Sequence, residues 1–182
     1  MVEAPIEAPG RLELVRAFVN TRSVDGGTDA IAAPAALGAW LAQRGLVAKR
    51  ARGTAADHRR ALALREALRA LLLENNGGGP APDAAGVLDA AARAAGLGVR
   101  FSGAGAALEP AARGVPGALG RLLAAVAEAM AEGSWERLKA CREGTCTWAF
   151  YDRSKNRSRT WCSMAVCGNR AKVKAWRGRR ER

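Results

Sequence analysis

Apolar side chains recur three and four residues apart through most of the first 133 residues, which is the spacing of one face of an α-helix. The stripes that predict helices are Leu12, Val15, Phe18 and Val19; Leu37, Trp40 and Leu41; Leu64, Leu68, Leu71 and Leu72; Val87, Leu88 and Ala91; and Leu119, Leu122, Leu123, Val126 and Met130. The longest predicted helix covers about residues 57–74 and stops at the breaker run of residues 75–79. Asp83 is the expected N-cap of the helix that follows Pro82.

A different pattern follows the fourth helix. Leu97, Val99 and Phe101 alternate with Gly98 and Arg100, which predicts a short strand. Abundant alanine and scarce isoleucine favour helix over strand elsewhere in this part of the chain. The sequence therefore predicts an α+β fold class, with a mostly helical N-terminal domain that contains a small β element.

Charge divides the chain near Gly133. The 182 residues carry 29 Lys and Arg against 17 Asp and Glu, a formal net charge of +12. Residues 1–133 have 15 basic and 13 acidic residues, whereas residues 134–182 have 14 basic and 4 acidic residues, together with all four cysteines. We therefore expect two domains, a helical domain of residues 1–133 and a basic module of residues 134–182.

The same composition sets expectations for location and class. No run reaches the roughly 18 apolar residues that span a bilayer, and the first ten residues lack the basic start and apolar run of a secretory signal, so a cytoplasmic protein without a membrane partner is expected. A single histidine excludes a Ser/His/Asp triad, and the glycines of residues 77–79 lack the lysine of a phosphate-binding loop. We expect no enzyme.

Polar residues at the end of the first helix form one candidate ligand site in the helical domain. Asn20 and Arg22 flank Thr21, and Asp25 follows in a glycine-rich loop. Such a group can line a pocket for a small-molecule effector, or it can simply terminate the helix.

The cysteines carry the most specific chemistry. Cys141, Cys146, Cys162 and Cys167 form two C-x4-C pairs that are separated by fifteen residues. Each pair supplies two thiolates from one turn, and the insert lets the two turns face each other around a tetrahedral ion. Zinc is the expected metal, while an iron site and free or disulfide-bonded thiols are the alternatives. Four thiolates leave no open coordination position for a substrate.

The residues around the cysteines predict a hairpin followed by a helix. Residues 147–151 and 158–161 are rich in strand-forming side chains and flank a polar turn at residues 152–157. A helix is expected to begin around residues 163–167, with Cys167 in its first turn, where the helix dipole favours a thiolate. The candidate nucleic-acid contacts on this hairpin and helix are Arg153, Lys155, Arg157, Arg159, Asn169, Arg170, Lys172, Lys174, Arg177, Arg179 and Arg180.

The block RLKACREGTCTWAFYDRSKNRSRTWCSMAVCGNRAKVKAWR at residues 137–177 resembles the CGNR zinc finger, whose name matches the run from Cys167 to Arg170. The run FVNTR at residues 18–22, the helix of residues 34–46 and the segment LALREALRALL resemble the ABATE domain that accompanies this finger in bacteria. The resemblance implies a bacterial transcription regulator linked to stress, in which the finger binds zinc and DNA and the ABATE domain senses a ligand.

The residues themselves support nucleic-acid binding. Clustered Lys and Arg displace counterions from a phosphate backbone, and arginine suits bidentate contact with guanine in the major groove. A basic run can also be a solvated face, and some of these arginines can balance the charge of the zinc site. A protein-interaction module, an RNA-binding module and a thiol redox switch therefore stay open as alternatives. Many bacterial regulators bind two-fold sites, which makes a homodimer the expected assembly.

Overall fold

The computed structural model describes residues 7–49, 51–103 and 105–180. The helices are α1 (Leu12–Val19), α2 (Pro34–Gln43), α3 (Ala55–Glu74), α4 (Pro82–Ala95), α5 (Gly114–Ala131) and α6 (Asn169–Arg180), with a 3-10 turn η1 (Trp135–Arg137) and a π-helical turn η2 (Met164–Gly168). Three antiparallel strand pairs join β1 (Arg22–Ser23) to β2 (Thr28–Asp29), β3 (Leu97–Ser102) to β4 (Gly105–Pro110) and β5 (Leu138–Ala140) to β6 (Ala149–Tyr151). This arrangement confirms the predicted fold class.

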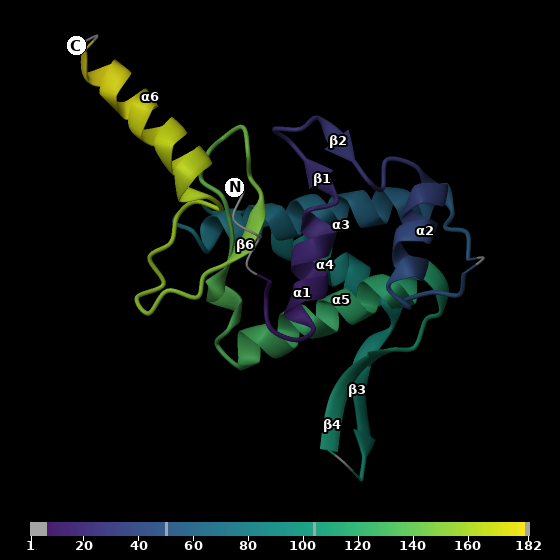
Figure 1. The fold of residues 1–182 in the computed structure, drawn as a ribbon. Coiled ribbons are helices and arrows are strands. Elements are labelled where there is room, and N and C mark those ends of the chain that lie inside the picture. Colours follow the sequence, from purple (N-terminus) through teal and green to yellow (C-terminus); the bar gives the residue numbers. More distant parts are fainter. Residues whose placement is uncertain (1–6, 50, 104, 181–182) are drawn as a thin grey trace.

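Helix α5 runs along one side of the helical domain and packs against the other helices α1 to α4 (Figure 1). By length and composition it could cross a membrane, but 61% of it is buried inside the protein, so its apolar surface is covered by neighbouring elements. The five apolar stripes of the sequence supply most of the buried side chains of this core.

Local signals fix where the helices begin. Thr54 accepts a hydrogen bond from the Asp57 backbone N–H, and Asp57 accepts one from the Thr54 backbone in return, so a capping box starts α3 before the predicted residue 57. The prediction that Asp83 caps α4 was wrong. Ala81 is the N-cap and Asp83 lies in the first turn, where its charge complements the helix dipole.

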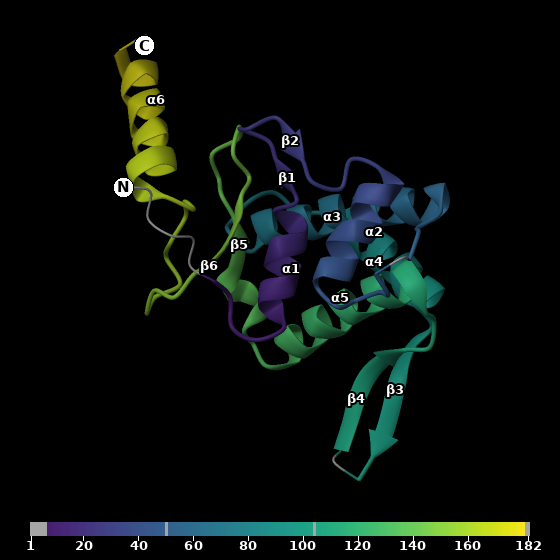
Figure 2. The ribbon, with the colours of Figure 1, turned by 45° about the vertical axis from the view of Figure 1, so that its right-hand side comes forward.

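Two elements project from opposite ends of the body (Figures 1 and 2). At one end, the predicted strand β3 pairs with β4, which the sequence analysis missed, and the resulting hairpin leaves Phe101 84% exposed. At the other end, α6 extends away from the cysteine cluster, and every side chain in its described part is exposed or half-buried.

The prediction of which strands pair in the basic module was wrong. Strand β6 pairs with β5, in the register Leu138 to Tyr151 and Ala140 to Ala149, while residues 158–161 adopt no strand. A buried ion pair between Lys139 and Asp152, 2.8 Å apart, lies at the end of β6, and the loop that follows packs around it, since the Lys139 ammonium also donates to Arg159 O at 3.3 Å. The Asp152 carboxylate also accepts hydrogen bonds from the backbone of Ser154 and Arg159.

The basic module shares its core with the helical domain. Leu138, Ala140, Ala149 and Tyr151 belong to the same buried cluster as α1, α3 and α5. A second, smaller cluster combines the cysteines with Phe150, Trp148 and Trp161. The boundary near residue 133 therefore separates compositions without separating the apolar core.

Candidate metal centre

The four cysteines converge from three short segments. Cys141 follows β5, Cys146 closes a turn in which its N–H donates to Glu143 O, and Cys162 and Cys167 flank the start of η2. Ser163 caps η2 by accepting a hydrogen bond from the Val166 N–H. The prediction that a helix begins around residues 163–167 is thus confirmed.

The sulfur positions fit a tetrahedral ion. All four Sγ atoms lie within 4.8 Å of one another, with 3.5 Å between Cys146 and Cys162 and 3.6 Å between Cys162 and Cys167. A tetrahedral site with zinc–sulfur bonds of about 2.3 Å places its sulfurs about 3.8 Å apart. The four thiols are free of disulfides and buried or half-buried, so the cluster has the chemistry and spacing of a structural zinc site.

The electrostatics of the cluster favour a bound cation. Hydrogen bonds from Cys146 and Cys162 lower the pKa of Cys141 to about 2, and bonding to that thiolate raises the pKa of Cys146 to about 12. The same thiolate raises the pKa of Cys162, and burial raises that of Cys167. Without a metal ion, four thiols this close favour one thiolate and three neutral thiols. A bound divalent cation stabilises the thiolate form of all four.

Arg159 supports the second cysteine pair. Its guanidinium donates to Trp161 O at 3.0 Å and to Cys162 O, and it lies 5.4 Å from the centre of the Phe150 ring. These contacts hold the backbone that leads into Cys162. Contact of Arg159 with nucleic acid stays a prediction, and it would have to exchange or extend these contacts with the metal-binding turn.

The other predicted contacts of the module fall into two groups. On the loop of residues 152–161, Arg153 donates to Glu7 O, Arg157 pairs with Glu136, and Lys155 is exposed. The group on the C-terminal helix consists of Asn169, Arg170, Lys172, Lys174, Arg177, Arg179 and Arg180.

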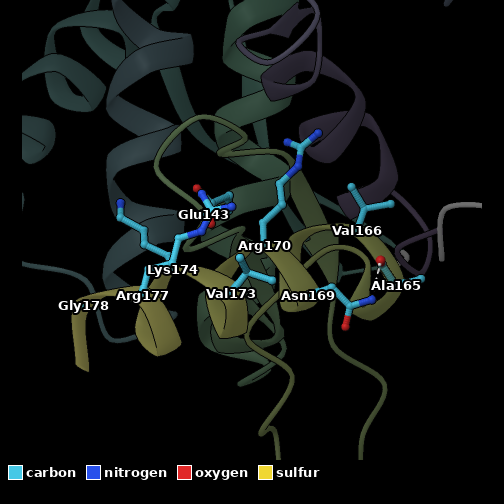
Figure 3. Close-up of a pocket in the computed structure, with 9 residues that line it drawn as sticks. All are labelled: Glu143, Ala165, Val166, Asn169, Arg170, Val173, Lys174, Arg177 and Gly178. Carbon is cyan, nitrogen blue, oxygen red and sulfur yellow. Dashed lines mark hydrogen bonds between the residues drawn. The ribbon is translucent and has the colours of Figure 1, made fainter. Parts of the chain in front are cut away.

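A groove of about 890 Å³ runs along α6. Arg170, Lys174 and Arg177 line it together with Val173, and Glu143 from the first cysteine turn lines it too (Figure 3). The i, i+4 and i+7 spacing of these three cations places them on one face of the helix.

Two residues at the start of α6 make contacts of their own. Asn169 donates to Ala165 O at 2.9 Å within the helix start. Arg170 forms an ion pair of 2.8 Å with Asp25, which lies in the turn between β1 and β2, so the helical domain contacts α6 directly. That contact raises the pKa of Arg170, which keeps its charge fixed. Nothing in the spacing of residues 25 and 170 could have predicted this pair.

Of the two candidate ligand residues of the helical domain, Asn20 holds the basic module and Arg22 pairs within the helical domain. Asn20 donates to Ala149 O at 2.9 Å and accepts from Ala149 N at 2.7 Å, as a neighbouring strand would. Arg22 lies 3.5 Å from Glu66 in an exposed ion pair. Effector binding at Asn20 and Arg22 stays a prediction, and at Asn20 it would require exchange of both hydrogen bonds.

Two buried arginines of α3, Arg65 and Arg69, also lie where the helical domain meets the basic module. Arg65 forms a two-pronged pair with Asp29, at 2.7 and 2.8 Å, and also donates to Thr21. Hydrogen bonding to Arg65 lowers the pKa of Asp29 below its ordinary value. Arg69 donates to Val19 O at 2.8 Å and to Thr147 O at 3.3 Å, so this network joins α1, α3 and the cysteine-bearing module.

Comparison with known families agrees with this architecture. Residues 12–133 match the family model of ABATE, described as "Putative stress-induced transcription regulator", and residues 137–180 match that of the CGNR zinc finger. No curated protein shows a significant match to the chain. The ABATE match spans well over half of the chain and the finger match contains all four cysteines. The chain therefore belongs to the ABATE family and carries a C-terminal CGNR zinc finger.

Proposed function

We propose that the chain is a DNA-binding transcription regulator without enzymatic activity, in which the zinc site fixes α6 for insertion into the major groove. The observation that carries the proposal is the exposure of α6. Its described residues bury no side chain and include six cations and no acidic group. A 12-residue helix of about 18 Å that buries none of its described side chains, and that touches the helical domain through the exposed ion pair of Arg170 and Asp25, is suited to a partner surface.

The distribution of charge on α6 suits a duplex. Arg170, Lys174 and Arg177 lie on one side, and the i, i+7 spacing puts Lys172 and Arg179 on another. A helix in the major groove has a phosphate backbone on each side, so cations on two sides reach both strands. Base edges would then face the residues between these two sides.

The zinc site explains how such a helix is held. Cys167 lies in η2, directly before α6, so metal ligation anchors the N-terminal end of the helix to the cluster of Phe150, Trp148 and Trp161. The C-terminal end stays free to follow the groove of the DNA. DNA binding is therefore expected to depend on zinc.

The test uses the zinc-loaded full chain. Selection of bound sequences from genomic fragments identifies a duplex, and fluorescence anisotropy at several salt concentrations then gives its affinity. Replacement of Arg170, Lys174 and Arg177 together by Ala should weaken binding and reduce the slope of log K against log salt by about 2.7, or about 0.9 per phosphate contact.

A matched control replaces three exposed arginines of the helical domain, Arg59, Arg93 and Arg100, by Ala. This control lowers the net charge equally and should leave the slope near that of the parent chain. If the triple variant on α6 keeps the parent affinity, or if no duplex is selected at all, the DNA-binding proposal is wrong. Preferential capture of RNA or of an acidic protein would assign the basic surface to that partner.

A further inference from the structure

The breaker run after α3 performs a second task besides ending the helix. Asn75 Nδ2 donates to Trp135 O and to Leu138 O, both at 3.0 Å. Asn76 Nδ2 donates to Ala140 O at 2.8 Å and to Thr160 O at 2.7 Å. Two neighbouring amides of the helical domain thus reach backbone that lies 60 to 84 residues further along the chain.

The two amides differ in what they join. Both partners of Asn75 precede the first cysteine pair, so Asn75 fastens one segment. The partners of Asn76 belong to both halves of the metal site, because Ala140 directly precedes Cys141 and Thr160 lies two residues before Cys162. A single NH2 group therefore bridges the segment of one cysteine pair to that of the other.

Burial and backbone geometry make this bridge rigid. Asn76 is 8% exposed, so water does not replace its partners freely. The turn that presents it is closed by Gly77 N to Glu74 O at 2.9 Å and by Gly78 N to Leu73 O at 2.8 Å. Gly77 has φ of +73°, and a Cβ at Gly78 would lie 2.8 Å from Leu73 O, so glycine is required at both positions.

A tetrahedral metal needs the two cysteine pairs at a fixed separation. Strands β5 and β6 position Cys141 and Cys146 relative to each other, but Cys162 follows a loop. The Asn76 bridge sets the distance of that loop from β5 together with a longer bond from Arg142 N to Thr160 O at 3.4 Å and with the ammonium of Lys139 in β5, which donates to Arg159 O at 3.3 Å. Groups that orient metal ligands in this way commonly change metal affinity by 10- to 100-fold when they are removed.

We propose that Asn76 is a positioning residue of the metal site, through which the helical domain sets the separation of the two cysteine pairs. This inference rests on metal binding by the cysteines and is independent of DNA binding. It also makes the turn after α3 a support of the zinc site, although this turn supplies no ligand.

The experiment measures metal affinity in the full chain. Zinc affinity is obtained by competition with a chelator, and Co2+ substitution reports tetrahedral thiolate geometry through its absorption bands. Asn76→Ala removes both donors and should weaken zinc binding by about 10- to 100-fold. Asn76→Asp also sets a carboxylate against two carbonyl oxygens, and its loss should be larger.

Asn75→Ala is the matched control, because it removes the same number of hydrogen bonds to backbone carbonyls but only from one segment. Urea unfolding of each zinc-loaded variant measures general stability, and Asn75→Ala should retain zinc affinity within about threefold for a similar loss of stability. Equal losses of zinc affinity in Asn75→Ala and Asn76→Ala, or parent affinity in Asn76→Ala, would overturn the proposal. If Asn76→Ala does not fold, Asn76→Ser keeps one donor and its affinity decides the question by the same comparison.

Discussion

Asp25 holds the guanidinium of Arg170 by an ion pair of 2.8 Å, and we expect its neutralisation to tighten DNA binding. Asp25→Asn keeps the size of the side chain but removes its charge. In the parent chain a phosphate or guanine oxygen that binds Arg170 must first displace the Asp25 carboxylate. The same carboxylate repels the DNA backbone, so both effects of the substitution have the same sign.

The exposure of the pair sets the size of the effect. Both side chains are 46% exposed, so the ion pair is hydrated and its contribution is small. Release of Arg170 should therefore raise DNA affinity by about two- to fivefold. If the freed guanidinium takes up a phosphate, the slope of log K against log salt should steepen by about 0.9.

Anisotropy titrations with a selected duplex provide the assay, and Asp89→Asn on an exposed face of α4 provides the control for net charge. In an Arg170→Ala background, Asp25→Asn should have no further effect, because the two residues act through one contact. The reasoning is refuted if Asp25→Asn leaves affinity unchanged, or if it tightens binding equally with and without Arg170.

Other predictions concern stability. Removal of the metal by a chelator should lower the Tm of the whole chain in one transition, measured by calorimetry, because strands β5 and β6, which flank the first cysteine pair, lie in the main core; an unchanged transition of the helical domain would contradict this. Asp152→Asn should lower the free energy of unfolding in urea by about 3 kcal/mol, because it leaves the buried Lys139 without a counter-charge, and Lys139→Met in the same chain should recover part of the loss. Burial alone would raise the pKa of Asp152, but hydrogen bonds from Lys139 and Ser154 outweigh burial, so the net pKa is lowered. The difference in unfolding free energy between the parent chain and Asp152→Asn should therefore shrink as pH falls below about 4. Thr147 has φ of +49° and a buried hydroxyl without a partner, so Thr147→Gly should stabilise the chain by about 1 kcal/mol in the same assay; a loss of stability would show that the hydroxyl is used.

Local rules were sufficient for the helices and for the metal ligands. Apolar spacing located α1 to α5, and two C-x4-C pairs identified the four cysteines that the fold brings within 4.8 Å. Both signals depend on residues close together in sequence. The capping box of Thr54 and Asp57 was missed, although Thr and an acidic residue three positions apart before the apolar run are its local signal.

Pairings between distant segments leave no signal in local sequence patterns. Residues 158–161 look like a strand, but β5 pairs with β6 instead, and the buried pair of Lys139 and Asp152 holds Arg159 by hydrogen bonds to its backbone. Asn75 and Asn76 read as helix breakers because their sequence context shows only the turn. Their partners become apparent only when the fold brings β5 against the end of α3.

Three asparagine side chains of the helical domain contact the basic module in the same way. Asn20, Asn75 and Asn76 bind the module through backbone atoms alone. Substitutions on the exposed surface of α6 therefore leave this attachment intact, and the helix can change its sequence without a compensating change in its support. A library randomised over residues 169–180 should accordingly keep its fold and its metal while its members differ in the partner sequence that they bind.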